Sequence, residues 1–119
     1  MKLHSTRDEN ESVTVSEAIR RGLAPDGGLY VPGDLPTLSV EDFDGLTSDD
    51  KIAQRLLTPI FEDDVLAGEL GEICSETYGF PVPLREIDPG THILELFHGP
   101  TAAFKDIGAA FLASCIFGK

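Results

Sequence analysis

The sequence has 119 residues, with 9 lysines and arginines against 21 aspartates and glutamates, and its formal net charge is −12. The length suffices for one domain with its own core. The charge argues against a nucleic-acid-binding protein, because no basic stripe is present to neutralise phosphates. No apolar run reaches the ~18 residues of a membrane span, and the N-terminal segment lacks the apolar core of a signal peptide. We therefore expect a cytoplasmic protein that binds neither nucleic acid nor membranes.

The amino-terminal third predicts small elements separated by turns. Residues 1–6, MKLHST, predict a short strand at the edge of a sheet. Thr14 and Glu17 have the spacing of a capping box, in which each side chain accepts from the other residue's amide. A helix is expected to follow, to run to about Arg21 and to end at Gly22.

A turn and two helices are expected next. The turn is Asp26–Gly28, whose glycines tolerate positive φ, and Leu29–Val31 then predicts a brief strand. A helix is expected to begin at Ser48 and to break or kink near Pro59. Its buried face is predicted from three residues at helical spacing: Ile52, Leu56 and Ile60. A second helix, closed by Gly79, is predicted from Leu66, Leu70, Ile73, Cys74 and Tyr78.

The carboxy-terminal third begins with residues 80–84, which their prolines keep extended. A turn at 88–90 separates them from a predicted strand over 92–97, and a helix is expected to start near 104–106. That helix is apolar almost all the way round, which is typical of a helix inside a larger protein. We therefore expect the chain to be the front part of a longer protein.

Neither a disulfide framework nor a metal site is expected. Cys74 and Cys115 lie in apolar, helical stretches, where a free cysteine behaves as a small hydrophobic residue. The acidic run Glu62–Asp64 is typical of a solvated turn.

The stretch ELFHGPTAAFKD, residues 95–106, places Lys105 in an apolar run whose other formal charges are Glu95 and Asp106. A buried ammonium is costly, so such a lysine is usually paired, neutralised or used chemically. Lysine also bonds covalently to carbonyl cofactors once desolvation has lowered its pKa. A lysine in the first turn of a helix that pairs with Asp106 or reaches water fits the spacing equally well.

Three blocks together resemble the amino-terminal part of the threonine synthase family: STR at Ser5–Arg7, GLAPDGGLYVP at Gly22–Pro32, and HGPT with AFKD at His98–Asp106. The resemblance extends over nearly the whole chain, although Asp8 stands where family members often have glycine. It implies an α+β amino-terminal domain over residues 1–80. Residues 81–119 would then be the start of an α/β domain of the tryptophan synthase β-like fold, truncated here.

The resemblance further implies a pyridoxal-phosphate (PLP) lyase of threonine biosynthesis, which converts O-phospho-L-homoserine and water to L-threonine and phosphate. Lys105 would carry PLP and act as general acid and base, with Phe104 packed beside the cofactor. Thr101 is a candidate substrate donor or, equally, a helix N-cap. Ser5 and Arg7 are weaker substrate-binding candidates, since an arginine can clamp a phosphate or carboxylate but is usually only solvated. His98 is expected to be structural.

Two parts of a PLP site have no counterpart in this sequence: a glycine-rich phosphate cradle and a partner for the pyridine nitrogen. The resemblance places both in the rest of the enzyme chain, which is therefore the expected partner, and the 119 residues alone are expected to be inactive. Two alternatives stay open. One is a non-catalytic acidic interaction module, a short descendant of the enzyme in which Lys105 is a relic. The other is a related PLP phospho-lyase.

Overall fold

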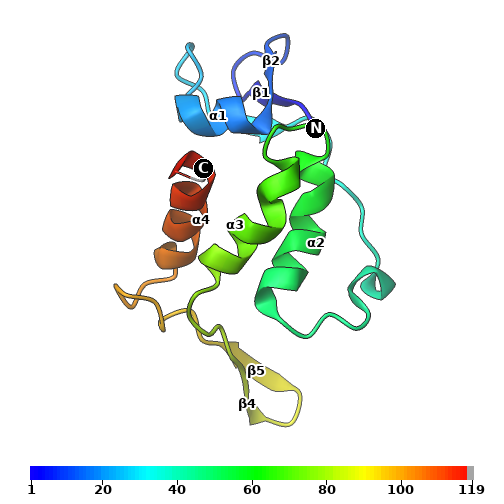
Figure 1. Ribbon diagram of the computed structural model, residues 1–119, viewed down its shortest axis with the longest axis vertical. Coiled ribbons are helices and arrows are strands. Elements are labelled where there is room, and N and C mark those ends of the chain that lie inside the picture. Colours follow the sequence, from blue (N-terminus) through cyan, green and yellow to red (C-terminus); the bar gives the residue numbers. More distant parts are fainter. Residues whose placement is uncertain (118–119) are drawn as a thin grey trace.

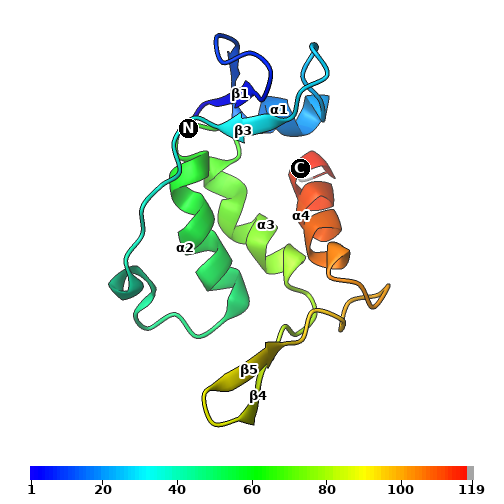
Figure 2. The ribbon, with the colours of Figure 1, turned by 180° about the vertical axis from the view of Figure 1, so that it is seen from behind.

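The computed structural model describes residues 1–117, and three neighbouring helices form its centre (Figure 1). They are α2 (Asp49–Phe61), α3 (Leu70–Thr77) and α4 (Lys105–Phe117). A small sheet and helix α1 (Val15–Arg21) lie at one end of these helices, and a hairpin extends from the other end, as the view from behind also shows (Figure 2). The fold is thus mixed α/β, with its core among helices.

The small sheet has the order β2 (Ser12–Val13), β1 (Leu3–Ser5), β3 (Tyr30–Pro32), and both pairs are antiparallel. The prediction that the first strand lies at an edge is therefore wrong, because β1 is the central strand. Its second partner, β3, comes from a distant part of the sequence, and the pattern of one short strand does not reveal such a pairing. The predicted strand at 29–31 is found one residue later.

Helix α1 begins and ends where its sequence predicts. The hydroxyl of Thr14 accepts a hydrogen bond of 3.2 Å from the amide of Glu17, which satisfies one of the free donors of the first turn. Gly22, at φ 74°, ends the helix, because glycine adopts this left-handed backbone without steric cost.

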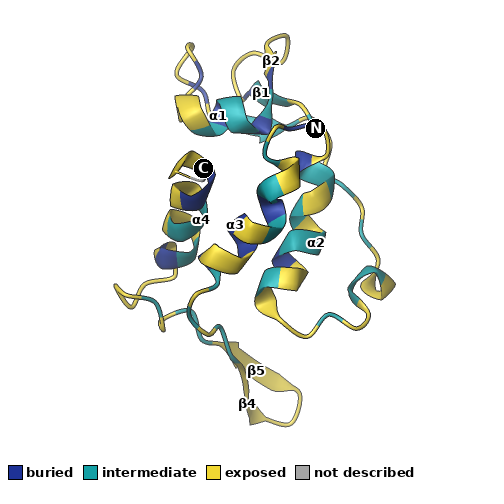
Figure 3. Cartoon of the chain, in the orientation of Figure 1, coloured by how far each residue is buried: buried dark blue, intermediate teal, exposed yellow. Residues whose placement is uncertain are grey.

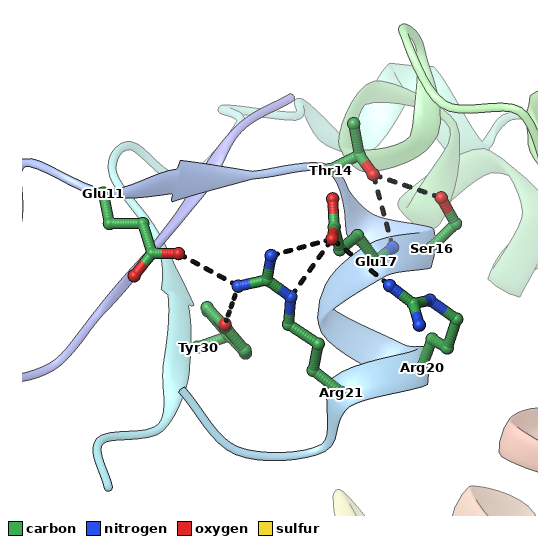
Figure 4. A network of polar contacts seen from close by, with 7 residues as sticks. All are labelled: Glu11, Thr14, Ser16, Glu17, Arg20, Arg21 and Tyr30. Carbon is green, nitrogen blue, oxygen red and sulfur yellow. Dashed lines mark hydrogen bonds and ion pairs between the residues drawn. The ribbon is translucent and has the colours of Figure 1, made fainter. Parts of the chain in front are cut away.

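The Glu17 side chain contacts two arginines of its own helix (Figure 4). Its carboxylate accepts hydrogen bonds of 2.8 Å from Arg21 and 3.3 Å from Arg20. Arg21 also donates to Tyr30 at 3.1 Å and to Glu11 at 2.9 Å. Arg21 thus connects α1 to strand β3 and to the loop that precedes β2.

The core lies where α1, α2, α3 and α4 meet (Figure 3). The predicted buried face of α2 is right at Ile60, which packs against the core. It is wrong at Ile52 and Leu56, which are 38 % and 49 % exposed, whereas Ala53 and Phe61 are buried. Residues 53, 57 and 61 have the same helical spacing as 52, 56 and 60, so periodicity alone does not distinguish the two faces. The ring of Phe61 meets Phe111 of α4 edge to face, with centroids 6.1 Å apart, and this contact favours the observed face.

The buried carboxylate of Asp64 ties α1 to the loop that follows α2. It accepts hydrogen bonds from the amide of Ser16 at 2.8 Å and from that of Leu66 at 3.0 Å. Burial alone would raise the pKa of Asp64, but these amide bonds outweigh it and hold the pKa below its ordinary value. Asp64 is therefore more stable as a carboxylate in the folded chain than in the unfolded one.

We expect Asp64→Asn to lower the free energy of unfolding at pH 7 by about 1–2 kcal/mol, the usual effect of losing a carboxylate cap. Because the folded pKa is depressed, this stabilisation is present above the unfolded pKa and disappears as pH falls through the folded one. Urea unfolding of both forms between pH 7 and pH 2 checks this, and the difference should shrink in acid. Asp63→Asn, at a side chain that is 83 % exposed, is the control and should change little.

The hairpin consists of β4 (Leu84–Asp88) and β5 (Thr91–Leu94), and every residue of both strands is exposed. Gly90, at φ 79°, makes the expected turn between them. The strand predicted over 92–97 is shorter than expected. The amide of Glu95 still donates to the carbonyl of Pro83 at 2.9 Å, but Pro83 has no N–H to return a bond, and the ladder goes no further. Among the described residues both sheets are antiparallel, and none of the helices there has the length and apolarity required to cross a membrane.

Helix α4 packs on α3 and α1 through one side only. Cys115 is buried on that side, and so is Cys74 of α3, and both thiols are free as expected. Burial raises the pKa of Cys115 to about 11. Other side chains of α4 remain open to solvent, with Phe117 82 % exposed.

Candidate functional site

The segment 98–106, which we call the lysine turn, leads from the hairpin into the start of α4. Its backbone folds back on itself, since the amide of Ala102 donates to the carbonyl of Gly99 at 3.1 Å. Ala102 has a φ of 55°, a left-handed conformation that is uncommon for a residue with a Cβ. The turn is thus tight and locally strained.

Asp106 lies inside this turn and is only 8 % exposed. Its carboxylate accepts hydrogen bonds from the hydroxyl of Thr101 and, at 2.9 Å, from the Thr101 amide. These two bonds, the hydroxyl first, lower the pKa of Asp106. A Cβ on Gly99 would lie 2.7 Å from the Cβ of Asp106, so the close approach of the two residues requires glycine at position 99.

Lys105 is the first residue of α4 and its side chain is exposed. Of the two interpretations left open by the sequence, the described residues agree with the one in which Lys105 lies in the first turn of a helix and reaches water, and not with a buried ammonium. Asp106 bonds to Thr101, and no ion pair involves Lys105 within residues 1–117. Lys105 is thus exposed to solvent next to a hydrogen-bonded turn.

The two other site residues predicted in this turn lie close to Lys105 in sequence. Phe104 is 71 % exposed, so its ring is free to pack against a bound group. Thr101 does not act as the N-cap of α4, because the helix begins at Lys105 and the Thr101 hydroxyl donates to Asp106.

A second polar group, which sequence reasoning missed, lies at the start of the lysine turn. Glu95 accepts hydrogen bonds of 2.6 Å from Arg85 of β4 and 2.7 Å from His98. These contacts, that of His98 first, lower the pKa of Glu95. The arrangement agrees with the structural role expected for His98. The isolated charge of Glu95 in an apolar run indicated that it needs a partner. The sequence did not identify that partner, because Arg85 lies ten residues earlier, on β4.

Ser5 and Arg7 form a cluster with the turn at Asp26. The hydroxyl of Ser5 donates to the Asp26 carboxylate at 2.8 Å, and the guanidinium of Arg7 donates to the Asp26 carbonyl at 2.8 Å. The pKa of Asp26 is lowered, first by the amide of Gly28 and then by the Ser5 hydroxyl. The STR block is therefore in direct contact with Asp26–Gly28, the DGG turn of the GLAPDGGLYVP block.

The structure does not bring this cluster to Lys105. The sheet that carries Ser5 and the lysine turn lie at opposite ends of α4 in both views of the ribbon (Figures 1 and 2). A helix of 13 residues is about 20 Å long at 1.5 Å per residue. Within the described residues, Ser5 and Arg7 therefore stabilise the amino-terminal sheet.

Comparison with known proteins gives one consistent family. The family model described as threonine synthase N terminus matches residues 2–78. The threonine synthase of Escherichia coli (strain K12) is 35% identical over 118 residues, which cover 98% of this chain and 28% of that protein. That of Pseudomonas aeruginosa is 36% identical over 120 residues, covering 94% of this chain and 25% of that protein.

Solved structures agree with the sequences. The crystal structure of threonine synthase from Escherichia coli superposes with a TM-score of 0.89 at 33% identity and covers 99% of this chain. The PLP-bound threonine synthase from Brucella melitensis superposes with a TM-score of 0.80 at 35% identity. Each match covers 28% of the solved chain, so this chain spans little more than a quarter of the length of its relatives.

Proposed function

The chain belongs to the threonine synthase family, and we propose that it supplies the amino-terminal part of a PLP-dependent threonine synthase in which Lys105 carries the cofactor. The proposed reaction converts O-phospho-L-homoserine and water to L-threonine and phosphate. The observation that carries the proposal is the match to threonine synthases over 98% of the chain, which includes the lysine turn. A non-catalytic acidic module derived from the enzyme would give the same match, so the activity of the hybrid enzyme described below distinguishes the two.

The lysine turn fits one end of PLP. Lys105 presents an exposed primary amine, which is the group that bonds to the aldehyde of the cofactor, and the exposed ring of Phe104 is available beside it. The phosphate and pyridine ends need backbone amides and a hydrogen-bonding partner, and the 119-residue sequence has no glycine-rich loop of that kind. The proposal therefore requires the remainder of the enzyme as partner.

In the proposed enzyme, PLP when bound supplies an electron sink for carbanion chemistry. Lys105 binds the cofactor through Nζ and, once displaced by the substrate amine, moves protons at Nζ as general base and acid. That role requires a partly desolvated amine near neutral pH. Because Lys105 is exposed in the described residues, the desolvation must come from the remainder of the enzyme.

We keep the proposed division into an α+β domain over 1–80 and the start of a PLP-binding α/β domain over 81–119. The family model ends at residue 78, which supports a boundary near 80. The exposed strands β4 and β5 would then join a larger sheet. The two free cysteines support a cytoplasmic location, where thiols stay reduced.

A hybrid enzyme tests the proposal. In it, this chain replaces the matching part of the Escherichia coli threonine synthase, and the hybrid is produced in a strain that lacks its own threonine synthase. We expect growth without added threonine, and release of phosphate from O-phosphohomoserine by the purified hybrid. A hybrid that folds and binds PLP but forms no threonine would contradict the proposal.

A further inference from the structure

Asp106 is a charged, buried residue to which the proposed reaction assigns no part. It lies next to Lys105 in the sequence, yet its carboxylate binds the amide and the hydroxyl of Thr101. Hydrogen bonds to an ionised acceptor are about twice as strong as those between neutral groups. Asp106 therefore holds the middle of the lysine turn against the first turn of α4.

The backbone of the turn needs such a constraint. Ala102, the residue after Thr101, adopts a φ of 55°, and a strained conformation of this kind persists only where the surrounding structure enforces it. A Cβ on Gly99 would lie only 2.7 Å from the Cβ of Asp106, so the Asp106 side chain also lies close against the other end of the turn. The hydrogen bonds of Asp106 to Thr101 and its close approach to Gly99 thus constrain the path of the chain from Gly99 to Ala102.

The same contacts set the direction of Lys105. The side chains of consecutive residues in an α-helix point about 100° apart. Because the Asp106 side chain points into the lysine turn, the side chain of Lys105 points away from it. The burial pattern agrees, because Asp106 is buried and Lys105 is exposed. We propose that Asp106 is a positioning residue, which orients the amine of Lys105 toward PLP by holding Thr101 and Gly99 against the start of α4. This inference rests on the proposed function, since Lys105 is the group that is positioned.

Three variants of the full chain test the proposal. Asp106→Ala removes the acceptor, Thr101→Val removes only the hydroxyl donor, and Thr101→Ser keeps that donor. Asp34→Ala, at an exposed loop residue, is the matched control for loss of a carboxylate. Far-ultraviolet circular dichroism selects the variants that keep the helix content of the unmodified chain, and Thr101→Val keeps the test available where Asp106→Ala does not fold.

Two readouts need no cofactor. In Asp106→Ala we expect amide exchange at Thr101 to become about 10- to 100-fold faster, the effect of losing a hydrogen bond to a charged group. The backbone order parameter of Lys105 should fall from about 0.85 to below about 0.6. Thr101→Val should produce a smaller change in both, while Thr101→Ser and Asp34→Ala should match the unmodified chain.

The third readout uses PLP itself in the hybrid enzyme, where it is trapped on lysine with borohydride and mapped by mass spectrometry. We expect the share of label on Lys105, relative to Lys2 and Lys51, to fall in Asp106→Ala and to be retained in Thr101→Ser. Unchanged Thr101 exchange in Asp106→Ala would overturn the proposal, as would faster exchange with an unchanged order parameter at Lys105. An unmodified hybrid enzyme without preference for Lys105 would count against the proposed function, while the two cofactor-free readouts would still decide the role of Asp106.

Discussion

Replacement of Lys105 by alanine in the hybrid enzyme is expected to lower the rate of threonine formation by at least about 10³-fold. General acid–base catalysis by one side chain contributes about 10²–10⁴-fold, and the variant also loses the amine that we propose holds PLP. The lysine turn should survive the change, because Lys105 is exposed and makes no ion pair in residues 1–117. Steady-state release of phosphate from O-phosphohomoserine measures the effect.

Lys51→Ala is the matched control, since Lys51 is an exposed lysine of α2. It should leave the rate within about twofold, because a surface substitution of this kind is close to neutral. A Lys105→Ala hybrid that retained a tenth or more of the unmodified rate would show that the proton-transferring amine lies elsewhere.

Gly28→Ala is expected to have the largest effect on stability, a loss of about 3 kcal/mol in the free energy of unfolding. A Cβ at this position would overlap the hydroxyl oxygen of Ser5, which is 1% exposed and bonded to Asp26. Overpacking at a closed site costs about 1–3 kcal/mol, and displacing Ser5 also breaks its bond to Asp26. Urea unfolding followed by circular dichroism gives the difference.

Gly68→Ala is the control, because a Cβ there would have no atom within 4 Å. Gly68 lies in a short 3-10 helix, Ala67–Glu69, before α3, and we expect a change below about 0.5 kcal/mol, as for most surface substitutions. Equal effects of the two variants would mean that the contact between the STR and DGG blocks does not stabilise the sheet.

The parts of the fold that depend on neighbouring residues could be predicted from the sequence. Four such features follow local rules of backbone geometry and hydrogen bonding. The structure confirms all of them: the cap at Thr14, the end of α1 at Gly22, the turn at Gly90 and the start of α4 near Lys105. Cys74 and Cys115 were also correctly expected to be buried and free.

The parts that depend on distant residues could not be predicted in this way. The central position of β1 requires pairing with β3, and the buried face of α2 is decided by contacts with other elements, including the edge-to-face contact of Phe61 and Phe111. At the candidate site, the lysine and its turn were found by motif. The hydrogen bonds of Asp106 to Thr101 and of Glu95 to Arg85 form because the folded chain brings these side chains together. Sequence spacing alone did not indicate either contact.

The most direct test of the account is to locate PLP on the chain. The hybrid enzyme, in which the Escherichia coli part supplies the remainder of the site, is mixed with PLP, reduced with borohydride and mapped by mass spectrometry. We predict near-stoichiometric label on Lys105 and little on Lys2 or Lys51, because in the proposed site only Lys105, held in its turn by Asp106, lies beside the groups that bind the phosphate and the pyridine. Label spread equally over the lysines of the hybrid would contradict the claim that Lys105 is the attachment site for the cofactor.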